Sequence, residues 1–102
     1  MSDGPPQLSE KESLVLALLV SRGSMYGLEL VEASGDALKR GTVYVTLGRM
    51  ADKGYVTSQE EDAPSGHRGP PRRKYRLTGL GQRAYQAHRS AAMAWRRGVV
   101  PA

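Results

Sequence analysis

The order of helical and strand patterns along the chain constrains its fold more than any single motif does. Three short stretches with the apolar spacing of amphipathic helices come first, two strand patterns separated by a turn-rich loop follow, and a last helical pattern closes the chain. The predicted segments are helices at about 10–21, 24–34 and 38–53, strands at 55–60 and 72–78 around a loop at 61–71, and a final helix from 79 to about 97.

Local signals support several of these boundaries. "SEKE", residues 9–12, predicts a capping box, in which Ser9 accepts from the backbone N–H of Glu12 and the Glu12 carboxylate accepts from that of Ser9. Ser24 is predicted to cap the second helix, in which Leu28, Leu30 and Val31 are expected to point inward. Gly54 is predicted to end the third helix, and Thr78 is predicted to cap the fourth.

Three helices followed by a hairpin indicate a mainly α fold with a small two-stranded β-hairpin. This is the plan of a winged helix-turn-helix, here with a C-terminal dimerisation helix. We expect a flexible N-terminus at 1–8, a winged helix-turn-helix domain at 9–78, a dimerisation helix at 79–97 and a tail at 98–102.

Charge and composition narrow the class of function. Fifteen Lys and Arg against ten Asp and Glu give a net charge of +5, and eleven of the fifteen are Arg. Arg suits bidentate contact with phosphate and guanine, so nucleic acid is the favoured partner and an anionic membrane surface the weaker one. The longest apolar run, "LVLALLV" at 14–20, is far shorter than the roughly 20 residues of a membrane span.

The sequence contains few residues in patterns that would support catalysis or metal binding. There is no cysteine, His67 and His88 have no second ligand at a metal-like spacing, and no nucleophile–base set or Gly-rich phosphate loop occurs. We therefore expect no enzyme activity, no cofactor and no metal site. The start of the chain has no basic-then-apolar signal pattern, and a cytoplasmic location is expected.

The segment "GTVYVTLGRM" at 41–50 combines a strong amphipathic pattern with residues that suit a helix poorly. Val43, Leu47 and Met50 form its apolar stripe. The opposite face carries short or basic side chains and follows two cations, which suits a helix that enters a DNA major groove about 12 Å wide. For this segment alone, a turn glycine at 41 and a core aromatic at 44 are an equally good interpretation.

The stretch "RGPPRRKYR" at 68–76 favours the DNA interpretation, because it places five cations and no acid on the tip and returning strand of the hairpin. A solvated basic surface is the simpler alternative for such a run. The residues assigned to DNA contact are Lys39, Arg40, Gly41, Thr42, Tyr44, Val45, Thr46, Arg49, Arg68, Arg72, Arg73 and Lys74.

"GTVYVTLGRMADKGYV" followed by "GPPRRKYRLTGLGQRAY" resembles the PadR-like transcriptional regulators, over about residues 14–85. The resemblance implies a homodimeric winged-helix repressor whose C-terminal helix pairs with the first helix of the partner, with small aromatic or drug-like effectors in some members. It also implies that Gly41, Thr42 and Tyr44 face DNA and that Arg73 and Lys74 are the basic pair of the wing. Val45 departs from the Pro common in the family at that position, as do Leu28 and the Lys39–Arg40 pair from its usual residues.

The last helix carries a broad apolar face. We expect it to dimerise, although the helix folding back on its own core is an alternative. A small aromatic effector pocket formed by Trp95 and His88 is a further hypothesis, against the simpler view that both residues only pack. The predicted dimer-interface residues are Leu14, Leu18, Tyr85, His88, Ala91, Ala92 and Trp95.

Together these patterns predict a sequence-specific regulator that binds a double-stranded DNA operator as a homodimer, most simply as a repressor and with a possible response to a ligand. The alternative is a protein-interaction module that has kept a winged-helix fold without a DNA role. An all-basic wing argues for the first, because an interaction module does not need it.

Overall fold

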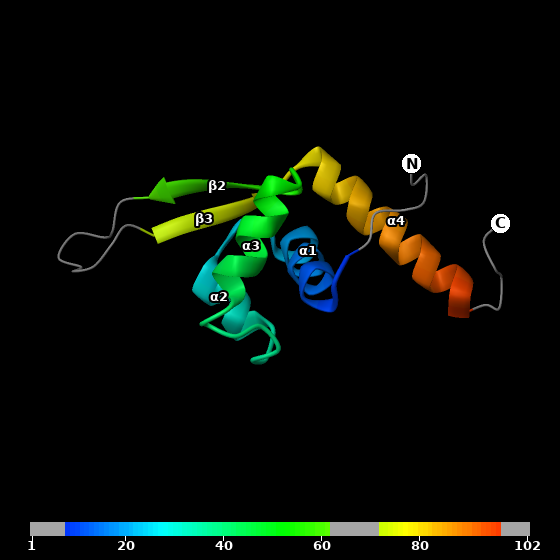
Figure 1. Ribbon diagram of the computed structural model, residues 1–102, viewed down its shortest axis with the longest axis horizontal. Helices are drawn as coiled ribbons and strands as arrows, with labels where there is room; N and C mark the ends of the chain where they lie inside the picture. Colours follow the sequence, from blue (N-terminus) through cyan, green and yellow to red (C-terminus); the bar gives the residue numbers. More distant parts are fainter. Residues whose placement is uncertain (1–7, 62–71, 97–102) are drawn as a thin grey trace.

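The computed structural model describes residues 8–61 and 72–96, except for the side chains of 95 and 96. In this part the helices, a small sheet and a projecting last helix follow in the predicted order (Figure 1). None of its helices has the length and apolar character that crossing a membrane requires. The elements are α1 (Glu10–Arg22), β1 (Met25–Tyr26), α2 (Gly27–Ala33), α3 (Val43–Asp52), β2 (Val56–Glu61), β3 (Arg72–Leu77) and α4 (Gly79–Arg96).

The sheet has three antiparallel strands in the order β1–β3–β2, whereas the sequence predicted two. The added strand is β1, in which Met25 pairs with Tyr75 and Tyr26 with Lys74. Pairing with the free edge of β3 buries the side chain of Met25 in the core. The prediction that Ser24 caps the second helix is therefore wrong.

Helix α2 begins only at Gly27, because the two residues before it are extended. Its N-cap is Tyr26, whose backbone N–H donates to the Glu29 carboxylate at 2.8 Å. Leu30 is fully buried as expected, but Leu28 is 42% exposed, so the expectation that it points inward is wrong. Residues two apart on a helix lie on nearly opposite sides of it, so Leu28 faces away from the core that Leu30 enters.

Helix α3 is also shorter than the predicted 38–53, because residues 35–42 form a turn before it. Leu38 anchors this turn in the core, and its backbone N–H donates to the Ser34 hydroxyl at 2.9 Å. The predicted stripe of Val43, Leu47 and Met50 is buried, as the sequence indicated.

One core joins the helices to the inner face of the sheet. The apolar faces of α1, α2 and α3 are buried against one another in this core. This packing stabilises helices that would be too short to be stable alone. The buried apolar residues are Val15, Leu16, Leu19, Met25, Leu30, Leu38, Val43, Leu47, Met50, Tyr55, Val56, Tyr75 and Ala84.

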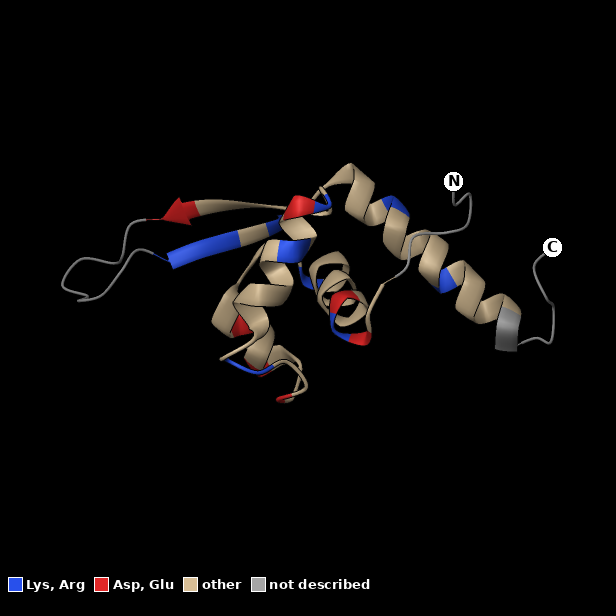
Figure 2. Ribbon diagram, in the orientation of Figure 1, with Lys and Arg blue, Asp and Glu red and all other residues tan. Residues whose placement is uncertain are grey.

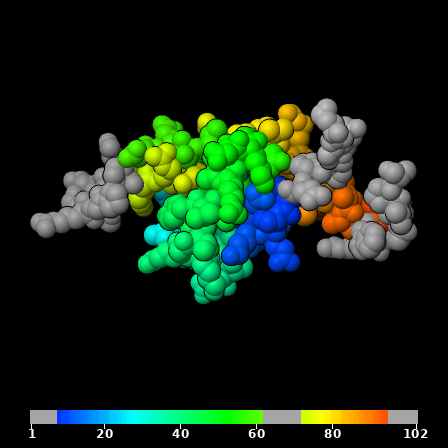
Figure 3. Space-filling model, in the orientation of Figure 1, coloured from blue at the N-terminus to red at the C-terminus, as the bar shows by residue number. Residues whose placement is uncertain are grey.

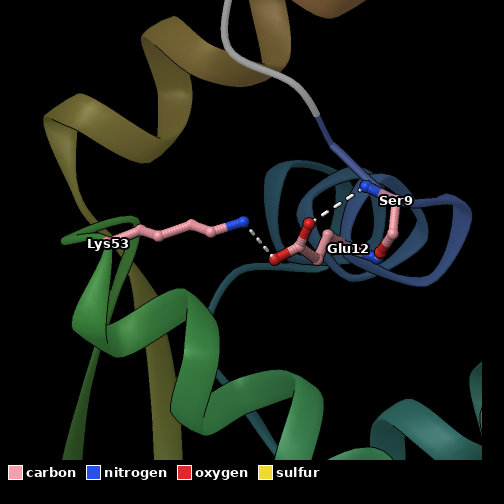
Figure 4. A network of polar contacts seen from close by, with 3 residues as sticks. All are labelled: Ser9, Glu12 and Lys53. Atoms are coloured by element: carbon pink, nitrogen blue, oxygen red, sulfur yellow. Dashed lines mark hydrogen bonds and ion pairs between the residues drawn. The ribbon is translucent and has the colours of Figure 1, made fainter.

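The predicted capping box at the start of α1 is present and is extended by an ion pair (Figure 4). Glu12 is only 6% exposed; it accepts from the Ser9 N–H at 3.0 Å and from the Lys53 ammonium at 2.8 Å. Burial opposes ionisation, but Lys53 and the Ser9 hydrogen bonds outweigh it, so the pKa of Glu12 lies below its ordinary value. This contact fixes the C-terminal end of α3 against α1.

Thr78 connects the hairpin to α4, as its predicted role as a cap requires. Its hydroxyl donates to the Gly54 carbonyl at 2.6 Å and accepts from the Gly81 N–H at 2.9 Å. Gly54 itself ends α3 with a φ of 81°, in agreement with the predicted helix stop. The predicted N-terminal segment up to residue 7 and the tail from 98 lie outside the described residues.

Candidate nucleic-acid interface

The solvent face of α3 is the first part of the candidate interface. Figure 3 shows α3 at the surface, with the hairpin on one side and α1 on the other. Val45 is 55% exposed, and Gly48 and Arg49 are exposed beside it. Thr46 is half-buried toward α1, where its hydroxyl donates to the Thr42 carbonyl at 3.4 Å. Of the predicted contacts on this helix, Tyr44, Val45 and Arg49 are exposed and Thr46 is half-buried.

Tyr44 lies on the flank of α3 that faces α2. Its ring tip lies over Gly27, so closely that a Cβ added there would be 2.6 Å from Cε1 and 2.7 Å from the hydroxyl oxygen. The residue is nevertheless 48% exposed. Tyr44 thus combines the two interpretations of the sequence: its ring tip packs on α2, while about half of the residue stays exposed.

Two cations precede α3 on an open surface. Lys39 and Arg40 are exposed in the turn before the helix, followed by the exposed Gly41 and Thr42. A Cβ added at Gly41 would meet no atom within 4 Å, so packing does not require a glycine there. This arrangement leaves the approach to the start of α3 unobstructed and positively charged.

Strand β3 carries a row of cations along the hairpin (Figure 2). Its side chains alternate between the faces, as the sequence predicted: Tyr75 is buried on the face covered by the helices, and Arg76 is exposed on the other. Arg73 shares the face of Tyr75, where its guanidinium donates to the Ser58 hydroxyl at 3.0 Å and lies 3.6 Å from the Glu60 carboxylate.

The outer face of β3 is organised around Tyr26. The Arg72 guanidinium lies 4.4 Å and the Lys74 ammonium 5.1 Å from the centre of its ring. The Tyr26 hydroxyl donates to the Glu61 carboxylate at 2.6 Å. That hydrogen bond, together with desolvation, raises the pKa of Tyr26. Tyr26 therefore supports two predicted wing cations from a strand that the sequence did not reveal.

The predicted DNA contacts thus fall into two described groups, one around α3 and one on β3. Arg68 belongs to a segment outside the described residues. Sequence reasoning missed Gly48 and Asp52, which are exposed on α3, because the outer face was drawn around Thr42, which precedes the helix. A projection centred on the buried stripe would have placed both opposite the core.

A separate hollow lies between α1 and α4, with a volume of about 490 Å³. Several predicted dimer-interface residues line it, among them Leu14, Tyr85, His88 and Ala92. Leu18 and Ala91 are half-buried nearby in sequence, and the Trp95 side chain lies outside the described part. Within the described residues, no group of three or more His, Asp or Glu could hold a metal ion.

A helical triad, an exposed third helix and a basic hairpin define the winged helix-turn-helix class of DNA-binding folds. The family model described as the transcriptional regulator PadR-like family matches residues 15–87, and the chain belongs to this family. PadR regulators bind DNA, so the protein is a DNA-binding transcriptional regulator and, as expected, not an enzyme. The family resemblance of the sequence is confirmed.

Solved structures agree with this assignment. A PadR family regulator from Clostridium difficile R20291 superposes with a TM-score of 0.74 at 24% identity, over 87% of this chain and 93% of that one. One from Eggerthella lenta superposes with a TM-score of 0.72 at 27% identity, over 85% and 75%. Bordetella bronchiseptica BpsR, whose DNA binding is regulated by 6-hydroxynicotinic acid, shares the fold at 18% identity and a TM-score of 0.69, over 96% and 67%. None of the curated proteins compared with the chain gives a significant match.

Proposed function

We propose that the protein is a homodimeric repressor that recognises a specific double-stranded operator through α3 and holds the DNA backbone with its basic turn and wing. The observation that carries this proposal is the exposed outer face of α3, with Lys39 and Arg40 exposed in the turn before it and the cations of β3 on the neighbouring hairpin (Figure 2). Phosphate contacts would position the protein, and side chains on α3 would read base edges.

The roles divide by position. Lys39 and Arg40 would neutralise a phosphate near the start of α3, and Gly41 would leave room for it. The Tyr44 hydroxyl would be a further hydrogen-bond donor. Arg49, which is exposed, and Thr46, which is half-buried beside it, would contact base edges. The wing cations Arg72, Arg73 and Lys74 would contact the backbone, as would Arg68 in the connecting segment.

Selection from a pool of random duplex DNA tests this function. We expect an enriched motif with twofold symmetry, because each protomer of a dimer would read one half-site. Affinity should fall with salt by about 0.9 log units per decade for each phosphate neutralised. A promoter that contains the motif should be transcribed less when the protein is present. If no motif is enriched and binding to the pool is weak at physiological salt, the protein-interaction alternative is favoured instead.

The dimer would form on α1 and α4. The C-terminal half of α4 projects beyond the rest of the molecule, away from the hairpin (Figure 1). Its half-buried His88, Ala91 and Ala92 lie on a helix that one protomer covers only in part. A second copy packed on this surface would bury these residues, together with Leu14 of α1 and the predicted Trp95.

A ligand response would use the same region. The hollow between α1 and α4 combines the Tyr85 ring and the His88 imidazole with apolar side chains, which suits a small aromatic molecule. The regulation of BpsR by 6-hydroxynicotinic acid provides a precedent in a protein of similar fold. Binding of aromatic acids, followed by the quenching of tryptophan fluorescence, would test whether Trp95 borders the pocket.

A further inference from the structure

Two residues on the solvent face of α3 disfavour the helix that carries them. Gly48 lies in the middle of α3, where glycine is the least favourable residue apart from proline. A Cβ added there would meet no atom within 4 Å, so nothing in the packing requires its absence. Val45 is β-branched and more than half exposed, so it contributes little to the core in return.

The two residues are neighbours on the helix surface. Positions three apart lie side by side on one face of a helix, and Arg49 follows Val45 by four. Val45 therefore lies next to Gly48, which has no side chain, while Arg49 lines a hollow on the side of α3 that faces α1. The face of α3 that the proposed function assigns to the major groove therefore carries an apolar side chain, Val45, next to a position without a side chain, Gly48.

The chemistry of the major groove identifies what such a surface would recognise. The edges of the bases present hydrogen-bond donors and acceptors, and the one apolar group among them is the C5-methyl of thymine. Val45 offers no hydrogen bond, so it gains nothing from the polar edges and would leave them unsatisfied. A close apolar contact also needs the helix backbone to approach the DNA, which a side chain at position 48 would hinder.

We propose that Val45 reads the C5-methyl group of a thymine in each half-site, and that Gly48 provides the clearance for this contact. The inference rests on the proposed DNA-binding function and specifies part of its base recognition. It also assigns a role to Gly48, which the sequence had not connected with DNA.

Replacing thymine by deoxyuridine in the selected duplex removes only the methyl group and therefore tests the contact directly. Each thymine of the motif is replaced in turn, and the affinity is measured by fluorescence anisotropy. We expect one position per half-site at which the replacement lowers the affinity about three- to fivefold, the effect of one buried methyl group. Val45→Ala should lower the affinity for the thymine duplex and abolish the difference between the two duplexes.

Gly48→Ala tests the clearance. This variant should unfold at a higher temperature than the wild type, because alanine favours the helix. It should nevertheless bind the selected duplex at least about fivefold more weakly. Gln86→Ala, at an exposed position of α4, is the control and should leave the affinity for DNA unchanged.

The outcomes separate this inference from the proposed function. Equal affinity for the thymine and deoxyuridine duplexes at every position of an enriched motif would overturn the methyl contact while leaving DNA binding intact. Undiminished binding by Gly48→Ala would overturn the clearance role. If the pool yields no motif, the proposed function fails, and this inference fails with it.

Discussion

The ring of Tyr44 occupies the space that a side chain at Gly27 would need, so α3 and α2 fit together only because Gly27 has no Cβ. Gly27→Ala would therefore push the ring tip outward. Because that ring is half exposed, it can swing away at a modest cost to stability, about 1 kcal/mol. We expect the larger effect on DNA affinity, measured by anisotropy on the selected duplex, since Tyr44 borders the proposed DNA surface.

A double-mutant cycle separates this effect from a general distortion of α2. In a Tyr44→Ala background there is no ring to displace, so Gly27→Ala should then change DNA affinity little. Gly41→Ala, where an added Cβ meets no protein atom, is a useful comparison for folding stability. If Gly27→Ala lowers affinity by the same factor with and without the Tyr44 ring, the contact between these two residues does not explain the loss.

The contact at Gly27 also shows which features the sequence could reveal. The capping box of Ser9 and Glu12 and the stripe of Val43, Leu47 and Met50 were predicted correctly, because each depends on residues within two helical turns. Strand β1 was missed because two residues are too few for a strand period. Its pairing with β3 depends on a partner far away in sequence.

The same distinction holds for the candidate interface. Positive charge and small residues around α3 are local properties, and the consecutive basic residues of β3 can be read directly from the sequence. What the sequence could not give is the support behind these residues: Tyr26 beneath Arg72 and Lys74, or the Ser58 hydroxyl beside Arg73. Such contacts arise from strand register, which no local pattern specifies.

The buried carboxylate of Glu12 should make stability depend on pH. Its pKa is lowered in the folded state, so its contribution is fully present above the ordinary pKa of a glutamate and is lost as pH falls through the lowered value. Glu12→Gln should destabilise the protein by about 1–2 kcal/mol at pH 7, a figure moderated by the partial exposure of Lys53. The difference from the wild type should shrink toward pH 3, as followed by urea unfolding.

Glu10→Gln is the matched control for this variant, because Glu10 lies in the same first turn of α1 but is exposed. It should change stability by a few tenths of a kcal/mol. A Glu12→Gln deficit that stays constant from pH 7 to pH 3 would show that the lost interaction does not depend on the ionised carboxylate.

The opposite orientations of Arg73 and Lys74 give a prediction for the wing. Side chains on both faces of β3 can each reach a phosphate if the hairpin enters a groove between two backbones. Arg73→Ala and Lys74→Ala should then each weaken binding to selected and random DNA by the same factor, and each should lower the slope of log affinity against log salt by about 0.9. Their effects should add in the double variant.

Salt titrations of the two single variants and the double variant provide the measurement. Arg83→Ala is a control for the loss of a cation, because Arg83 lies on α4, which follows the end of β3 opposite to Arg73 and Lys74. An effect of Arg73→Ala without any effect of Lys74→Ala would indicate instead that the wing lies flat on one strand of the duplex.

The proposed dimer can be tested at one small residue. Ala92 lines the hollow between α1 and α4, and in a dimer its methyl group would lie in an apolar interface. Ala92→Glu would bury an unpaired carboxylate there, so we expect a monomer in sedimentation velocity and weakened binding to a twofold motif. Gln86→Glu places the same charge on an exposed position of the same helix and should leave a dimer. A dimer that persists in Ala92→Glu would place the interface on another surface.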